Sequence, residues 1–151
     1  MRNVILTCVM MVSGIIATPG QQKSAKEEKF DLDEVVIEGQ VILENTCFAC
    51  HNPNTASHDE ILAPPLVGIK QRYLRSFPSK DEFVTNMKSF VYDPSSEKAL
   101  MHGPVRRFGV MPKTALTEEE VAAVVDYIFE NELPAPKWFA EHERKMHGGN
   151  R

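Results

Sequence analysis

Apolar side chains recur along this chain with the spacing of α-helices. Near the C-terminal end they form a single helical stripe, which consists of Val121, Val124, Val125, Ile128 and Phe129. The spacing repeats in the middle of the chain at Phe83, Met87 and Phe90. No alternating run of strand length occurs, so the pattern predicts an all-α fold.

Local signals mark where these helices begin. They stand at four residues, Asp31, Ser79, Asp93 and Thr117. All but Asp93 precede a glutamate by three positions, the spacing at which the two side chains cap each other's backbone. Asp93 is followed by a proline, which suits the first position of a helix. A further short helix is expected over residues 69–77, between a glycine and a proline.

The first twenty residues differ in character from the rest. A cationic start at Arg2 is followed by an apolar stretch over 4–16, well short of the roughly 20 residues that span a membrane. Small and helix-breaking residues then precede a polar run. This layout predicts a secretory signal peptide over 1–20, export to the periplasm, and a flexible linker over 21–30. An uncleaved anchor at the outer face of a membrane is the alternative.

The rest of the chain shows no internal repeat and no domain boundary. We expect one folded domain over 31–134, followed by a charged C-terminal tail over 135–151 that is frayed. Trp138 and Phe139, just past the last predicted helix, are expected to cover an edge of the core.

Charge and cysteine content narrow the possible functions. The 151 residues carry a net charge of −4, which argues against nucleic acid as a partner, because a phosphate backbone requires a clustered cationic surface. Of the three cysteines, Cys8 lies in the apolar leader. The mature chain would therefore keep two thiols, Cys47 and Cys50, and could not build a disulfide framework.

These two thiols belong to the run Cys47-Phe48-Ala49-Cys50-His51. Its spacing is that of covalent haem c attachment, with both sulfurs on one side of a turn and the histidine as the proximal iron ligand. Three other interpretations share the letters. A zinc site needs four ligands and lacks a second cysteine pair, a redox-active pair would follow a strand, and a structural disulfide leaves the histidine without a role. The motif predicts one haem c.

With this motif, the chain resembles the class I cytochrome c family over most of residues 31–134, which we therefore expect to be a cytochrome c domain. The likeness rests on Gly39 and Leu43, placed before the motif like the family's helix-crossing glycine and apolar residue, and on Tyr127 in the last helix. It implies an all-helical domain in which the first and last helices cross closely at the glycine, around one covalently bound haem.

The segment after the motif extends the likeness. Residues 63–68 read Ala-Pro-Pro-Leu-Val-Gly, similar to the family's Gly-Pro-x-Leu-x-Gly, with Ala63 in place of glycine. The resemblance implies that the Pro64 carbonyl accepts a hydrogen bond from the far nitrogen of His51. Such a bond would fix the tautomer and the orientation of the iron ligand.

The resemblance also implies a methionine as the second iron ligand, from a loop ahead of the last helix. Met111, followed by a proline that stiffens the loop, occupies that place. The chain has seven methionines, and core filling is the competing role for each of them. Met101 and His102 are the alternative ligands.

Other candidate residues carry less weight. Arg106 and Arg107 suit either haem propionates or an ordinary solvated pair. His58, His142 and His147 are expected at the surface.

Ligation by His51 and Met111 would leave no open iron position for a substrate. We therefore expect electron transfer between a donor and an acceptor redox protein, with no enzymatic activity, by a monomer that associates at most peripherally with a membrane. The alternatives are a haem c subunit or relay module of a larger membrane-associated oxidoreductase complex, and a ligand-binding haem sensor if Met111 does not coordinate iron.

Overall fold

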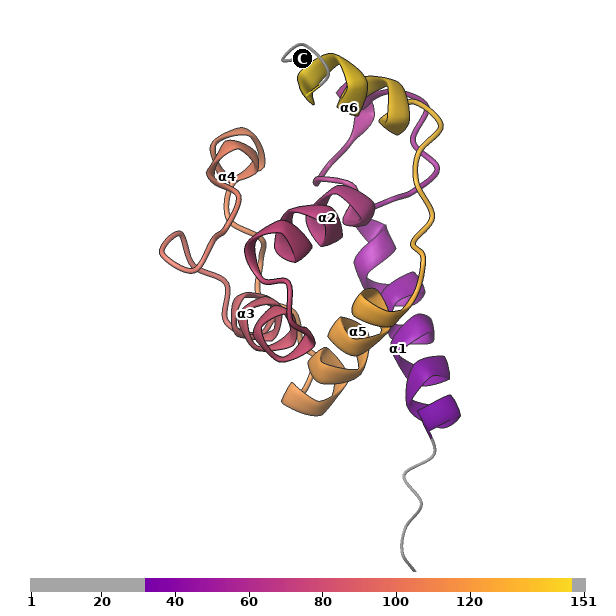
Figure 1. The fold of residues 1–151 in the computed structure, drawn as a ribbon, viewed down its shortest axis with the longest axis vertical. Helices are drawn as coiled ribbons and strands as arrows, with labels where there is room; N and C mark the ends of the chain where they lie inside the picture. The colour runs from indigo at the N-terminus through magenta and orange to yellow at the C-terminus, as the bar shows by residue number, and fades with distance from the viewer. Residues whose placement is uncertain (1–31, 148–151) are drawn as a thin grey trace, which may run out of the picture. The chain divides into compact units, whose positions relative to one another are not determined.

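The computed structural model describes residues 32–147, which form six α-helices joined by loops and two short 3-10 turns (Figure 1). The helices are α1 (Leu32–Thr46), α2 (Leu66–Ser76), α3 (Lys80–Tyr92), α4 (His102–Phe108), α5 (Glu118–Glu130) and α6 (Phe139–His147). No strand occurs in this part of the chain, which confirms the all-α prediction. The predicted signal peptide, the linker and the Asp31 cap lie outside the described residues.

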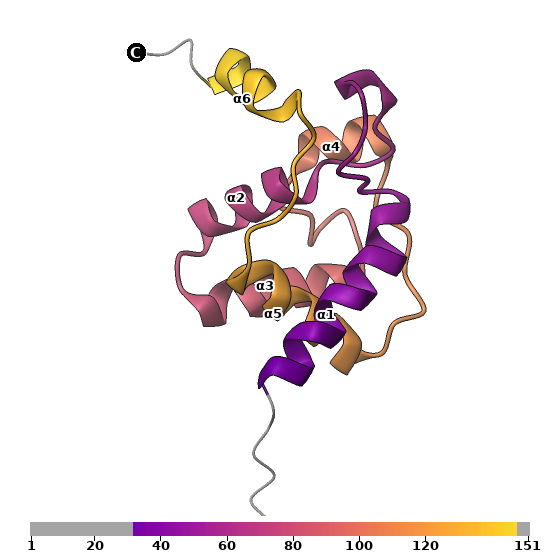
Figure 2. The same ribbon diagram turned by 90° about the vertical axis from the view of Figure 1, so that its right-hand side faces the viewer.

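The first and fifth helices cross at close range (Figures 1 and 2). A Cβ built on Gly39 would overlap the carbonyl oxygen of Ala123 and come within 2.9 Å of the Tyr127 Cβ. Leu43, one turn further along α1, is 1% exposed. The close crossing at Gly39 is confirmed, and the neighbour that requires a glycine is the backbone of α5 as well as Tyr127.

Behind this crossing, α3 packs on α5 and completes the core. Phe83 is fully buried and meets Phe129 edge-to-face with ring centroids 5.1 Å apart. Tyr73 from α2 approaches the other side of Phe83, at 5.8 Å between centroids. Burial of each such side chain stabilises the fold by about 1.5–3 kcal/mol, so these helices are held by packing rather than by their own propensity.

Two of the predicted helix starts are confirmed in detail. The Ser79 hydroxyl accepts a hydrogen bond from the Glu82 amide at 3.3 Å. Thr117 and Glu120 form a complete capping box, with bonds of 3.2 and 2.7 Å. The helix expected over 69–77 is α2, and it starts earlier because the Pro65 carbonyl already accepts the first helical bonds.

The helix start predicted at Asp93 is wrong. Asp93 instead ends α3, where its amide donates to the Ser89 carbonyl and its carboxylate pairs with Lys98 at 2.6 Å. An Asp-Pro pair suits a turn as well as a cap, and here the turn prevails. The next helix, α4, begins only at His102 and carried no start signal in the sequence.

The expectation of a frayed end is wrong for residues 139–147, which form α6 above α2 in Figures 1 and 2. The indole nitrogen of Trp138 donates to the Thr55 carbonyl at 3.2 Å. Phe139 is 7% exposed, and its ring lies against Gly68. The prediction that these two aromatic residues cover an edge of the core is confirmed. Their packing holds α6 in place, because this short and charged segment gives only a weak helix signal in the sequence. None of the helices in the described part of the chain is both long and apolar enough to cross a membrane.

Candidate functional site

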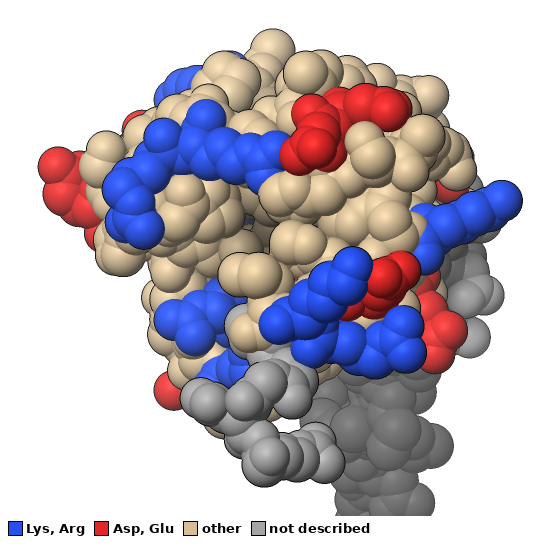
Figure 3. All heavy atoms as spheres, turned by 90° about the horizontal axis from the view of Figure 1, so that it is seen from above, with Lys and Arg blue, Asp and Glu red and all other residues tan. Residues whose placement is uncertain are grey.

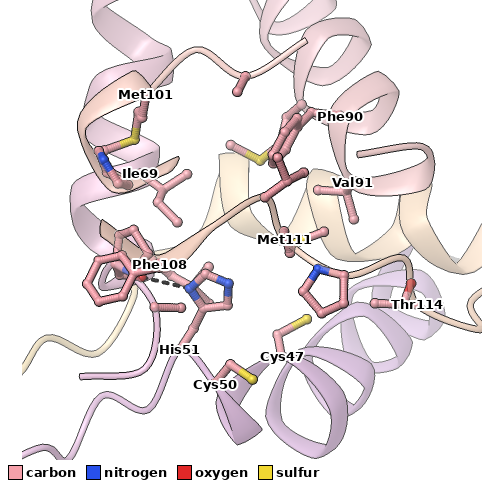
Figure 4. Close-up of a pocket in the computed structure, with 18 of the residues that line it drawn as sticks. Cys47, Cys50, His51, Ile69, Phe90, Val91, Met101, Phe108, Met111 and Thr114 are labelled. Carbon is pink, nitrogen blue, oxygen red and sulfur yellow. Dashed lines mark hydrogen bonds between the residues drawn. The ribbon is translucent and has the colours of Figure 1, made fainter. Parts of the chain in front are cut away.

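The sequence-predicted site residues line one cavity of about 310 Å³ (Figure 4). They are Cys47, Cys50, His51, Pro64 and Met111. The structure thus brings together side chains from the end of α1, the loop before α2 and the loop before α5.

The end of α1 places the cysteines. The helix stops at Thr46, and the chain continues in a 3-10 turn over Cys47–Ala49. The amides of Cys50 and His51 both donate to the Cys47 carbonyl, at 3.2 and 2.9 Å. In a 3-10 turn, side chains three residues apart lie on the same side, so both thiols face the cavity beside the His51 ring (Figure 4).

His51 is held through its ring. Its Nδ1 lies 2.7 Å from the Pro64 carbonyl oxygen, which confirms the predicted hydrogen bond. Burial lowers the pKa of His51 below its usual value, and the bond to Pro64 opposes this shift only in part. The ring is therefore neutral at pH 7, with its proton on Nδ1 facing the carbonyl and the lone pair of Nε2 free for a metal.

The surroundings of Cys47 differ from those of a redox-active thiol. Burial raises the pKa of Cys47 to about 11, whereas nucleophilic Cys-x-x-Cys motifs depend on a lowered thiol pKa. In the described part of the chain, no group of three or more His, Cys, Asp or Glu side chains is placed to hold a metal ion. Both observations argue against the thioredoxin-like and zinc interpretations of the motif.

Three methionines line the cavity: Met87 belongs to the buried core face of α3, whereas Met101 and Met111 come from either side of α4. Met111 lies in the loop after Gly109, whose φ of +83° turns the chain out of that helix, and Met101 lies just before it. His102 is exposed on the first turn of α4 and does not line the cavity. Met101 therefore stays open as an alternative to Met111, and His102 loses support. Iron ligation by Met111 remains a prediction.

The walls of the cavity are almost entirely apolar. They combine core residues of α2 and α5 with side chains that the sequence had not assigned to a site, among them Phe90, Val91, Leu100, Phe108, Val110 and Leu116. The helical stripe of α3 was visible in the sequence, but which of its residues face a site follows only from the packing. Such a space, with a haem-attachment motif at its edge and a neutral imidazole in its lining, fits a large, flat, apolar cofactor.

Several other candidate residues lie outside this cavity. Neither Arg106 nor Arg107 lines this cavity. Arg107 instead lies 2.8 Å from Nε2 of His58 and donates to the His58 carbonyl at 3.1 Å. His58 and His142 are half-buried rather than plain surface residues, and their rings stack with centroids 4.4 Å apart. The side chain of His147 lies outside the described part.

Comparison with known proteins decides the family. The family model described as "Cytochrome c" matches residues 36–131, from the middle of α1 to the residue after α5. This chain belongs to the cytochrome c family. Membership supports haem-based electron transfer and implies covalently bound haem c.

The chain is also similar to a protein of known sequence. It is 31% identical over 137 residues to a protein of Aquifex aeolicus described as uncharacterized, an alignment that covers 79% of this chain and 88% of the other. No solved structure matches. The family match includes the haem motif, Pro64 and Met111 but ends before Trp138 and α6.

Proposed function

We propose that this cytochrome is an exported carrier that shuttles single electrons between respiratory redox proteins in the periplasm, with one haem c bound covalently through Cys47 and Cys50. The observation that carries the proposal is a single cavity lined both by the Cys47–His51 motif and by Met111 from a separate loop. When bound there, haem c supplies an iron couple that gains and loses one electron.

Residues from two parts of the chain would hold that cofactor. The Pro64 carbonyl orients His51, so that one nitrogen is fixed as the donor to Pro64 and the other is left for iron. The Met111 thioether would be the second iron ligand and would favour the reduced state relative to a second imidazole. With both positions taken by protein, substrates have no site at the iron, which supports electron transfer and argues against an enzyme.

One observation favours a second candidate function. α6 lies beyond the family match yet packs on the domain through Trp138 and Phe139. An added docked helix also suits a fixed haem c subunit or relay module of a membrane-associated oxidoreductase complex. Gel filtration of native membrane extracts separates the two, because a free, processed monomer elutes below the 17.0 kDa of the full chain and a subunit elutes with its complex.

Mass spectrometry of the protein purified from a host that matures c-type cytochromes tests the attachment. The expected mass is that of the processed chain plus one haem. Cys47→Ala and Cys50→Ala should each impair attachment. A chain at its bare polypeptide mass with a Cys47–Cys50 disulfide would overturn the proposed function.

A further inference from the structure

A second cavity lies next to the candidate haem site, between α2, α4 and α6. Its volume is about 650 Å³, and its apolar walls include Ile61, Gly68, Phe108, Trp138, Phe139 and Met146. It contains neither cysteine of the motif, nor His51, nor Met111. The two cavities share a wall made of Pro64, Met101, Pro104 and Phe108. We call this second cavity the α6 cleft.

The charged side chains of the α6 cleft are predominantly cationic. Arg72 and Arg75 come from α2 and Arg107 from α4, and Glu143 is the one carboxylate among the lining residues. Such a concentration runs against the composition of the chain, whose net charge is −4. Figure 3 views the molecule from the α6 end and shows Lys and Arg side chains spread over this face, with carboxylates between them.

Two of these guanidinium groups have no polar partner among the residues that the structure describes. In the described part of the chain, Arg72 and Arg75 make no hydrogen bond and no ion pair. Their exposed side chains remain hydrated and can receive an anion at small desolvation cost. Arg107, in contrast, is fixed by His58 and lies over the Phe108 ring at 4.7 Å.

Two stacked imidazoles lie beside Arg107 at the edge of the cleft. His58 stacks on His142, and its Nδ1 faces Asp59 at 3.7 Å. The pKa of His58 is lowered, first by burial and then by the charges of Arg107 and His142, against the opposing effect of Asp59. The charge of Arg107 thus acts on His58 at this side of the cleft, although burial has the larger effect on the pKa of His58.

We propose that the α6 cleft binds a small amphipathic anion, a molecule with an aromatic or aliphatic body and one carboxylate, sulfonate or phosphate group. The apolar walls take the body, with the Trp138 and Phe139 rings beside it, and the guanidinium groups of Arg72 and Arg75 take the anionic group. A volume of this size falls in the range of small-molecule sites. The proposal does not depend on the proposed electron-carrier function.

Isothermal titration calorimetry of the haem-loaded protein tests the proposal with two probes of similar shape. One is 8-anilinonaphthalene-1-sulfonate, and the other is its neutral counterpart N-phenyl-1-naphthylamine. We expect one site for the sulfonate and at least tenfold weaker binding of the neutral probe. Equal binding of both probes, or no binding of the sulfonate, would overturn the proposal.

A pair of double variants separates the cleft from bulk charge. Arg72→Gln/Arg75→Gln should weaken sulfonate binding at least tenfold. The control Arg106→Gln/Arg144→Gln removes the same charge from α4 and α6 outside the cleft lining, and should change binding less than twofold. Equal losses in both variants would show that general electrostatics, and no specific site, attracts the probe.

Nuclear magnetic resonance locates the bound probe. Trp138 is the only tryptophan of the chain, so the spectrum contains a single indole N–H resonance. This resonance should shift on addition of the sulfonate in the wild type and in the Arg106→Gln/Arg144→Gln control. Saturable binding without any shift of this resonance would place the probe elsewhere and refute the assignment.

Discussion

At the scale of single residues, the site depends on how His51 is held. Its short hydrogen bond to Pro64 and its burial act on the same ring, the first by fixing the tautomer and the second by keeping it neutral. A carbonyl acceptor cannot be removed by changing one side chain, because every residue has one. The ligand opposite His51 is the more accessible target for mutation.

Met111→Ala should open one side of the iron. We expect the variant to lose the weak far-red sulfur-to-iron band of the ferric protein, to bind carbon monoxide when reduced, and to have a lower reduction potential. Absorption spectroscopy and a potentiometric titration measure all three.

Met101→Ala is the matched control, since Met101 lines the same cavity from the other side of α4. It should keep the band and remain closed to carbon monoxide. If instead Met101→Ala loses the band and Met111→Ala retains it, the ligand is Met101.

At the scale of elements, the crossing of α1 and α5 brings two backbones together at Gly39. The first atoms that any side chain here would meet belong to the backbone of Ala123, which cannot rotate away. A clash with backbone has to be relieved by separating the helices, which would disturb the core they enclose.

Gly39→Ala should therefore destabilise the haem-loaded protein by at least about 2 kcal/mol, in the upper range for overpacking. Gly103→Ala is the control, because nothing lies within 4 Å of a Cβ at that position of α4. It should be neutral or slightly stabilising. Denaturant unfolding measures both, and equal stability of the two variants would show that the close crossing is not a constraint.

The docking of α6 makes a second prediction at this scale. Phe139→Ala should destabilise the protein by about 3 kcal/mol, the usual cost of truncating a buried phenylalanine. Lys145→Ala, which removes only the exposed pair with Glu141, should leave stability almost unchanged. Denaturant unfolding again measures the difference, and a null effect of Phe139→Ala would mean that α6 is not docked in solution.

The helices also show which features of the fold could be predicted from the sequence. The caps at Ser79 and Thr117 were predictable because donor and acceptor lie three residues apart. The same kind of local signal gave a wrong helix start at Asp93, which lies in a turn and pairs with Lys98. α6 could not be predicted, since the Trp138 bond that holds it reaches back to Thr55 across most of the chain.

The candidate site divides in the same way. The motif is local, and the likeness to a known family supplied Pro64 and Met111. The apolar wall was not predictable, because Phe90 and Leu100 come to line the same cavity as His51 only through the packing of α3 and of the loop before α4. The stacking of His58 on His142 is likewise a tertiary contact, which no sequence pattern predicts.

At the scale of the whole molecule, the net charge is negative, but an exposed cationic side chain lies close to the site. The chain carries −4 in total, yet Lys113 is exposed two residues after Met111, with its ammonium group 5.2 Å from the centre of the Tyr92 ring. Electron transfer between proteins needs close approach, so the charge near the site should outweigh the total in docking.

Lys113→Glu should therefore slow electron transfer to a native acidic partner, and the wild-type rate should fall as ionic strength rises. Lys137→Glu makes the same charge change just before α6 and should have a smaller effect. Stopped-flow kinetics against ionic strength measure both. A faster reaction of Lys113→Glu would show that the acidic total governs the encounter.

The proposal of one haem c bound by His51 and Met111 is best tested by the visible spectrum of the purified protein, because the spectrum reports haem attachment and both iron ligands together. It should be recorded for the oxidised protein, the reduced protein, and the reduced protein under carbon monoxide. Covalent haem bound by His51 and Met111 should give a c-type spectrum, a far-red sulfur-to-iron band in the oxidised protein, and no change on adding carbon monoxide to the reduced protein. A spectrum without haem, or a reduced protein that binds carbon monoxide at once, would contradict it.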